Sequence, residues 1–178
     1  MGQHRKLIAG IALGFVVGIA ASGSLNAEFQ AQFKGLKETE AAESLLQAGM
    51  KAAGDGSWER IAIAATYYEG FADKSRGQAM LDQLTTSPKV AASDLRRIAR
   101  FHAELGEWAK ARPLYDKAIS MKPKDAGLLA EAGAYYNVMG DRATAEDLFT
   151  RSFTAEKDNP WSYAMAAASY LGKKPRPW

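Results

Sequence analysis

Apolar and polar residues follow a helical pattern over most of this chain. Between residues 39 and 171, apolar side chains recur three and four positions apart, in short runs separated by turns rich in glycine, proline and aspartate. No run shows the two-residue alternation of a half-buried strand. The pattern therefore predicts an all-α fold. The expected helices cover residues 39–53, 58–69, 74–86, 92–104, 108–121, 126–138, 142–156 and 160–171.

Two of the expected turns are copies of each other. Gly106, followed by Glu107, and Gly140, followed by Asp141, lie 34 residues apart, each between two apolar helical runs. Glycine ends a helix without steric cost in the left-handed conformation, and an acidic residue suits the start of the next helix. A fixed period of this length indicates a stack of similar helical hairpins that bury their apolar faces against each other. Such stacks are typical of binding proteins.

Small residues recur at the same places in both copies. Ala99 and Ala111 correspond, one period later, to Gly133 and Ala145. Small side chains at these places allow the two helices of a hairpin to approach closely. The bulky residues expected to fill the space between neighbouring hairpins are Tyr115 and Phe149.

The repeated positions resemble the tetratricopeptide repeat, TPR. The resemblance weakens upstream, where residues 71–73 replace the glycine turn, and downstream, where only one helix remains. It implies a TPR-type helical-hairpin solenoid of about seven to eight antiparallel helices. The residues that carry the resemblance are Leu95, Ile98, Ala99, His102, Ala111, Tyr115, Ala118 and Pro123, then Leu129, Ala132, Gly133, Tyr136, Ala145, Phe149 and Ser152.

The domain organisation follows from the period. We expect an N-terminal anchor or signal segment, a juxtamembrane segment with a capping helix, one degenerate and two well-formed repeats, a final capping helix, and a basic proline-rich tail. The corresponding residues are 1–27, 28–57, 58–91, 92–125, 126–159, 160–172 and 173–178. The tail either frays, docks on a partner or folds back onto the stack.

In TPR proteins the first helix of each hairpin lines a concave groove that holds the ligand. Carried over to this sequence, the groove is mostly small and apolar, and Arg96 and Arg100 are its only concentrated charge. For Arg96, Arg97 and Arg100 the alternative explanation is a solvated face paired with acids such as Glu131 or Glu104. The Lys and Asn residues of a carboxylate clamp are missing from the matching positions. The implied partner-binding residues are Ala62, Thr66, Arg96, Arg100, Ala130, Ala134, Asn137, Trp161, Ala164 and Ala168.

Residues 7–25 form an apolar stretch without an ionisable group, preceded by Arg5 and Lys6. As a helix, this stretch spans about 28 Å, which is close to a bilayer core. A cleaved secretory signal is the alternative. Retention as a transmembrane helix is favoured by small residues every fourth position, which form a face for helix packing in lipid and for pairing with a second copy. These residues are Gly10, Gly14, Gly18 and Ser22.

The positive charges before residues 7–25 place the N-terminus in the cytoplasm. We therefore expect a single-pass protein of the bacterial inner membrane with its repeats in the periplasm, or a soluble periplasmic protein if the segment is cleaved. The opposite side, with the repeats in the cytosol, is a topological alternative known from TPR import receptors. The chain has no cysteine, so no disulfide stabilises it.

Composition and motifs argue against several classes of function. The formal net charge is only +3, and basic residues alternate with acidic ones, which gives no case for nucleic-acid binding. No metal-binding, phosphate-binding or nucleophile motif is present, and His102 stands where the repeat has a packing residue. We expect no catalytic residue, cofactor or metal. The predicted function is a non-catalytic scaffold for protein partners of a membrane or envelope complex; the alternative is a soluble periplasmic assembly factor.

Overall fold

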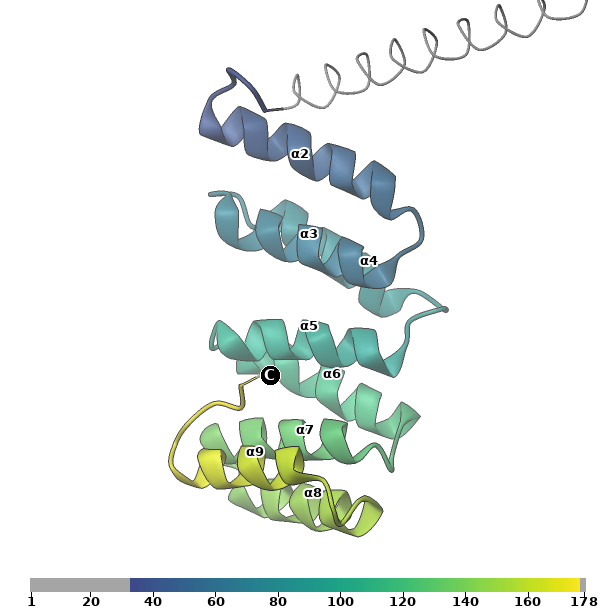
Figure 1. Ribbon diagram of the computed structural model, residues 1–178, viewed down its shortest axis with the longest axis vertical. Coiled ribbons are helices and arrows are strands. Elements are labelled where there is room, and N and C mark those ends of the chain that lie inside the picture. The colour runs from purple at the N-terminus through teal and green to yellow at the C-terminus, as the bar shows by residue number, and fades with distance from the viewer. Residues whose placement is uncertain (1–32, 177–178) are drawn as a thin grey trace, which may run out of the picture. The chain divides into compact units, whose positions relative to one another are not determined.

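The computed structural model describes residues 33–176 and divides the chain after Gly54 into two compact units (Figure 1). Within residues 33–176 the chain is entirely helical, with eight helices and no strand. This confirms the all-α prediction. The predicted transmembrane segment and its packing face at Gly10, Gly14, Gly18 and Ser22 lie outside the described residues. Among the described helices, none is both long and apolar enough to cross a bilayer.

The described part of the first unit contains one helix, α2 (Glu38–Ala53). It has no fully buried residue, and its Leu45 side chain is exposed. Glu38 and Glu40 lie in its first turn and Lys51 in its last, which is the favourable arrangement for the helix dipole. The expectation that α2 caps the first hairpin stays a prediction.

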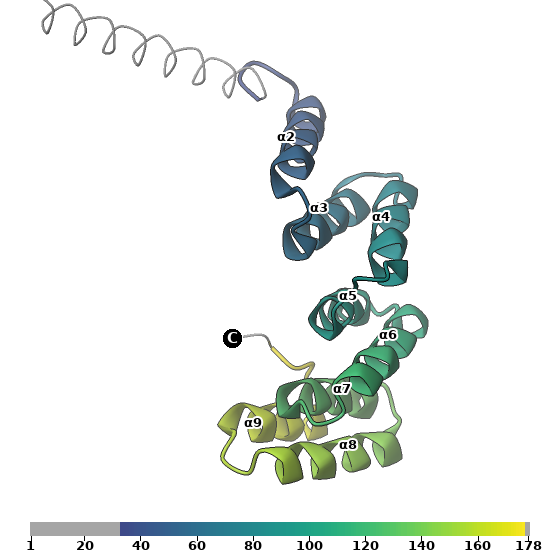
Figure 2. The same cartoon turned by 90° about the vertical axis from the view of Figure 1, so that its right-hand side faces the viewer.

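The second unit holds three helical hairpins and a final single helix. The hairpins are α3 (Ser57–Gly70) with α4 (Ser75–Thr86), α5 (Ala92–Glu104) with α6 (Trp108–Met121), and α7 (Ala126–Val138) with α8 (Arg142–Ala155). The last helix, α9 (Pro160–Tyr170), packs along α7. In Figure 2 the first helices of the hairpins lie on one side of the stack and α4 and α6 lie on the other. The predicted helix boundaries hold to within one residue.

The two copied turns have the geometry that the sequence predicts. Gly106 and Gly140 adopt φ values of 79° and 94°, in the left-handed region. After the second turn, the Asp141 carboxylate caps α8 by accepting a hydrogen bond of 3.1 Å from the backbone N–H of Thr144. The upstream hairpin turns differently, because Asp73 there accepts a 2.8 Å bond from the backbone N–H of Ser75.

Small residues bring the helices of each hairpin together. A Cβ atom placed on Gly77 would lie 2.5 Å from the backbone nitrogen of Tyr68, so only glycine fits where α4 crosses α3. At Gly133 a Cβ would lie 2.8 Å from the Phe149 ring of α8. Ala99 and Ala111 are completely buried in the middle hairpin. Tyr115 and Phe149 are both buried in a core that otherwise consists mainly of alanine and leucine.

Candidate interaction surface

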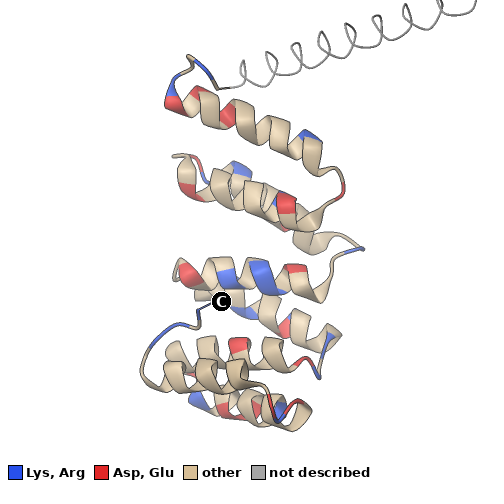
Figure 3. Ribbon diagram, in the orientation of Figure 1, with Lys and Arg blue, Asp and Glu red and all other residues tan. Residues whose placement is uncertain are grey.

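The candidate site is the side of α3, α5, α7 and α9 that is turned away from α4 and α6, which we name the first-helix face (Figure 2). Charges of both signs are interspersed along the described helices (Figure 3). The basic side chains Arg96 and Arg100 project from α5, and the acidic Glu131 lies across from them on α7. This group of three is the strongest concentration of charge on the face.

Both arginines bind the same carboxylate. Arg96 donates to Glu131 Oε2 from Nε at 3.1 Å and from Nη2 at 2.8 Å. Arg100 donates to Oε1 from Nε at 3.1 Å and also contacts Oε2 through Nη2. The Glu131 side chain is only 4% exposed, whereas Arg96 and Arg100 keep 26% and 24% of their side-chain surface. One negative charge therefore holds two positive ones, and a surplus positive charge remains at the surface.

A buried tyrosine of α6 completes this network. The buried hydroxyl of Tyr115, on α6, donates to Glu131 Oε1 at 3.0 Å. Burial and the negative charge of Glu131 raise the pKa of Tyr115 well above its usual value, so its hydroxyl remains a donor. Burial alone would lower the pKa of Arg100, but the hydrogen bond and charge of Glu131 outweigh it, and the pKa is raised. The network joins α5, α6 and α7.

The structure thus answers one question that the sequence left open. Arg96 and Arg100 are paired with a carboxylate, and the partner is Glu131 rather than Glu104. Each arginine uses part of its donor set for this pairing and remains partly exposed. The pairing positions the two guanidinium groups on the face; it does not remove them from it.

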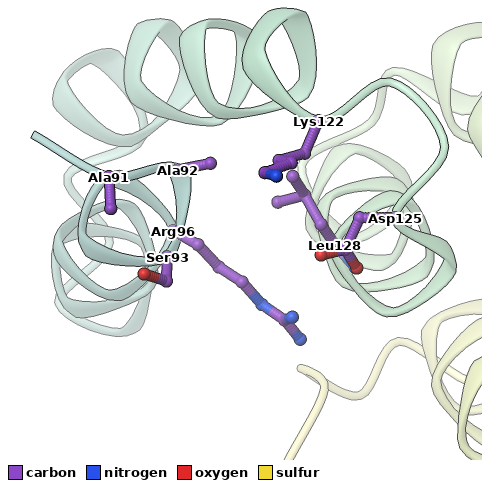
Figure 4. Close-up of a pocket in the computed structure, with 7 residues that line it drawn as sticks. All are labelled: Ala91, Ala92, Ser93, Arg96, Lys122, Asp125 and Leu128. Atoms are coloured by element: carbon purple, nitrogen blue, oxygen red, sulfur yellow. The ribbon is translucent and has the colours of Figure 1, made fainter.

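A small pocket lies at the start of α5 and α7, beside Arg96 (Figure 4). Figure 4 shows Arg96 extending from α5 while Asp125 and Leu128 project from the beginning of α7. The pocket has a volume of about 170 Å³, smaller than the ~300–1,000 Å³ typical of small-molecule sites. It fits a single side chain of a partner rather than a whole ligand. The lining residues are Ala91, Ala92, Ser93, Arg96, Lys122, Asp125 and Leu128.

Two residues of the predicted groove are not accessible. Ala130 and Ala134 are completely buried, so the expectation that they line an open groove is wrong. The reason is the close packing of α9 on α7, since both helices carry small residues and α9 buries Ala166 and Ser169. Asn137 reinforces this contact by donating from Nδ2 to Ser169 Oγ at 3.0 Å.

The other predicted residues remain at the surface. Ala62, Thr66, Trp161 and Ala164 are exposed, and Asn137 and Ala168 are half-buried. The accessible part of the first-helix face is therefore provided by α3, α5 and α9, and α7 contributes little beyond Asn137.

Sequence reasoning missed one residue of this face. Trp58, near the start of α3, is 58% exposed, and the Arg97 guanidinium lies 5.1 Å from its ring centroid. The Arg97 side chain is held in turn by Asp94 at 3.5 Å. Asp94 also accepts a 2.9 Å bond from the Ser57 hydroxyl, which ties α3 to α5. The sequence signal that could have identified Trp58 is that it stands outside the repeat pattern. None of the repeated core positions requires a tryptophan there.

A second polar cluster joins the first two hairpins. Glu107 Oε1 accepts a 2.7 Å bond from the Tyr68 hydroxyl, and Glu107 Oε2 lies 2.8 Å from Nδ1 of His102. Lys110 donates at 2.8 Å to both Tyr68 and Gln78. His102 is buried, as predicted for a packing residue. Burial lowers its pKa more than Glu107 raises it.

At Glu107, in the same cluster, hydrogen bonding outweighs burial in its effect on the pKa. Burial acts to raise its pKa, but the hydrogen bonds from Tyr68, His102 and Lys110 together lower it. A buried imidazole with its nitrogen on a carboxylate is a packing element here, since its ring contacts those of Tyr68 and Phe101, which also contact each other. Within residues 33–176, no group of His, Asp and Glu residues is arranged to hold a metal ion.

Comparison with protein-family models, with curated proteins and with solved structures finds no significant match to this chain.

Proposed function

We propose that this chain is a non-catalytic adaptor built from TPR-type hairpins, and that its first-helix face binds a segment of a protein partner. The observation that carries the proposal is the pair of tryptophans at the beginnings of first helices. Trp58 near the start of α3 and Trp161 near the start of α9 expose 58% and 55% of their surface. Tryptophan and arginine are the residue types that most often dominate binding energy in protein interfaces.

The arginines support the same proposal. Arg97 stacks on Trp58, and the surplus charge of Arg96 and Arg100 lies on the same helix, α5. Because Glu131 fixes both guanidinium groups in advance, a partner that uses them loses less conformational entropy on binding. An aromatic anchor beside pre-ordered cations favours a partner with both an apolar residue and an acceptor group.

The test is site-specific photo-crosslinking of the full chain in its native membrane. A crosslinker at Thr66, exposed on α3, is compared with one at Gln83, exposed on α4. We expect a partner to be captured from Thr66 only, and the capture to weaken at least about fivefold in Trp58→Ala, as for a hot-spot residue that contributes more than ~1 kcal/mol. Equal capture from Gln83, or capture unaffected by Trp58→Ala, would refute the assignment of the face.

We further propose that residues 7–25 anchor the adaptor in the bacterial inner membrane with its helical domain in the periplasm. The support is the length and apolar character of this segment and the positive charges that precede it. Deletion of residues 7–25 is expected to release the chain from the membrane fraction after a carbonate wash. Protease added to spheroplasts should degrade the helical domain; protection of the domain would contradict the proposed side.

A further inference from the structure

The chain does not leave the stack after α9. Gly172 adopts φ 70°, in the left-handed region, and the N–H of Lys173 bonds the carbonyl oxygen of Ala168 at 3.0 Å, which closes the helix. Residues 173–176 then run back along the first-helix face towards the end of α5 (Figures 1 and 2). We name these four residues the returning segment. Of the three alternatives that the sequence offered, folding back is the one that the structure shows for these residues.

Lys174 ends on the last turn of α5. Its ammonium donates to the carbonyl oxygen of Glu104 at 2.8 Å and to that of Ala103 at 3.2 Å. The last carbonyl groups of a helix have no partner within the helix and carry the negative end of its dipole. A lysine ammonium has several donors on one compact positive charge, so it can bond both carbonyl groups at once. The carbonyl oxygen of Ala103 also accepts a 3.1 Å bond from the backbone N–H of Gly106. The end of α5 is therefore a seat for a lysine side chain.

The next residue, Pro175, lies beside small and apolar side chains of α9. Pro175 is buried, although Lys174 and Arg176 on either side of it are exposed. It borders a cavity of about 300 Å³ together with Ala164, Met165 and Ala168 of α9. Proline has no backbone N–H, so its burial leaves no donor unsatisfied, and its fixed φ favours the extended form that the segment needs.

Both contacts lie on the accessible part of the first-helix face. Ala164 and Ala168 are residues that the TPR resemblance assigns to ligand binding, and here they lie against the chain's own extended segment. The small side chains of α9 leave open space beside the proline ring. The structure thus shows the chemistry that this part of the face accepts: an ammonium at the end of α5, followed by a proline ring on α9.

We propose that the end of α5 and the adjoining side of α9 form a docking site for an extended lysine-proline segment, filled in the isolated chain by its own Lys174 and Pro175. The proposal rests on the proposed function, because it names the segment chemistry that the first-helix face accepts. A partner that carries the same dipeptide enters by displacing the returning segment. The returning segment therefore weakens partner binding until it is released.

The size of this effect follows from the connection. A segment joined to its site by a short linker has an effective concentration of the order of mM. A free peptide that binds the empty site with a Kd of ~100 µM must therefore bind the filled site roughly tenfold more weakly. The comparison of filled and emptied sites is the measurable quantity.

The experiment uses the full chain in mild detergent and a fluorescein-labelled peptide with the sequence of residues 172–178. Lys174→Glu empties the site, because a carboxylate is repelled by the carbonyl groups at the end of α5. We expect fluorescence anisotropy to show a Kd for the native peptide on the Lys174→Glu chain that is at least tenfold lower than its Kd on the native chain. A peptide with the same lysine replaced by glutamate should bind Lys174→Glu at least tenfold more weakly than the native peptide.

Lys157→Glu is the matched control. It makes the same charge change at an exposed lysine that does not line the cavity beside Pro175, and the Lys157 ammonium has no hydrogen bond or ion pair within residues 33–176. The Lys157→Glu chain should keep its site filled and bind the peptide as weakly as the native chain. A chain that ends after Lys173 keeps the backbone bond that closes α9 and should bind the peptide as Lys174→Glu does.

Three results would overturn the proposal: no binding of the native peptide to any emptied chain, equal binding to native and emptied chains, or equal binding of the glutamate peptide. The Thr66 crosslinking experiment separates this failure from failure of the proposed function. Capture of a partner from Thr66 together with no peptide binding would refute the lysine-proline site alone. Peptide binding together with equal capture from Gln83 would refute the wider face and leave the seat in place.

Discussion

Replacing Glu131 with glutamine is expected to destabilise the helical domain strongly, although the side chain keeps its shape. The carboxylate oxygens of Glu131 accept hydrogen bonds from two guanidinium groups and from the Tyr115 hydroxyl. Glutamine has one acceptor oxygen and places an N–H₂ group against cations that also only donate. Arg96 and Arg100 then lose their counter-charge at the same time.

The magnitude follows from the burial of the three groups. Removing one partner of a fully buried charge pair costs about 3–5 kcal/mol. Water already reaches Arg96 and Arg100, whose side chains are 26% and 24% exposed, so part of that cost is avoided. We expect Glu131→Gln to lower the free energy of unfolding by about 2–3 kcal/mol, and therefore to lower Tm by roughly 4–12 °C for a chain of this size.

The assay is urea unfolding of the full chain in mild detergent, followed by circular dichroism at the helix band, with hydrogen exchange to locate the loss. Amides of α5 and α7 should exchange faster in Glu131→Gln, since the network joins these helices. The matched control is Glu146→Gln, because Glu146 binds Arg142 at 2.8 Å but the two side chains are 51% and 69% exposed. A surface pair of this kind contributes little to stability, because water screens both charges. Equal destabilisation by the two glutamine variants would refute the reasoning.

Three further predictions concern the core and the turns. Acid should destabilise the domain in two stages. Because the pKa of His102 is lowered in the folded chain, stability is lost as pH falls through the unfolded value of about 6.5, and the lowered pKa of Glu107 adds a second loss below about pH 4.5. His102→Gln should therefore remove the upper stage from a curve of unfolding free energy against pH. Gly77→Ala should lower the free energy of unfolding in urea by about 2–3 kcal/mol, because its Cβ would lie 2.5 Å from the backbone of α3. At Gly127 the nearest atom to an added Cβ is 3.6 Å away, so Gly127→Ala should leave this free energy unchanged or raise it by up to ~1 kcal/mol. Asp141→Ala should cost about 0.5–2 kcal/mol through loss of the α8 cap and be rescued by asparagine at the same position; an unchanged Tm would show that the cap contributes nothing.

Elements set by neighbouring residues could be predicted from the sequence. The helix boundaries agreed to within one residue, because apolar spacing, caps and glycine stops act over a few positions. The turns at Gly106 and Gly140 were predicted in position and conformation for the same reason. The burial of Ala99 and Ala111 followed from the period, since consecutive helices must cross where small residues allow it.

Features that join distant segments were predicted incompletely. The sequence offered Glu131 and Glu104 as partners of the arginines, and only the spacing of α5 and α7 selects Glu131. The repeat pattern treated Ala130 and Ala134 as groove residues, but α9 packs too closely on α7 for either to be accessible. Ser57 was absent from the predicted site, yet its hydroxyl bonds Asp94 across the first two hairpins.

The sequence by itself determined that this chain is helical, where its helices and turns lie, and which residues are small enough to let consecutive helices cross. These properties depend on propensities and periodicity within a few tens of residues. Only the tertiary structure decided that two arginines share one buried carboxylate, that α9 closes over α7, and that Lys174 and Pro175 return to the end of α5. Those contacts depend on distances between helices that are not neighbours in the chain, and no local pattern of residues specifies such distances.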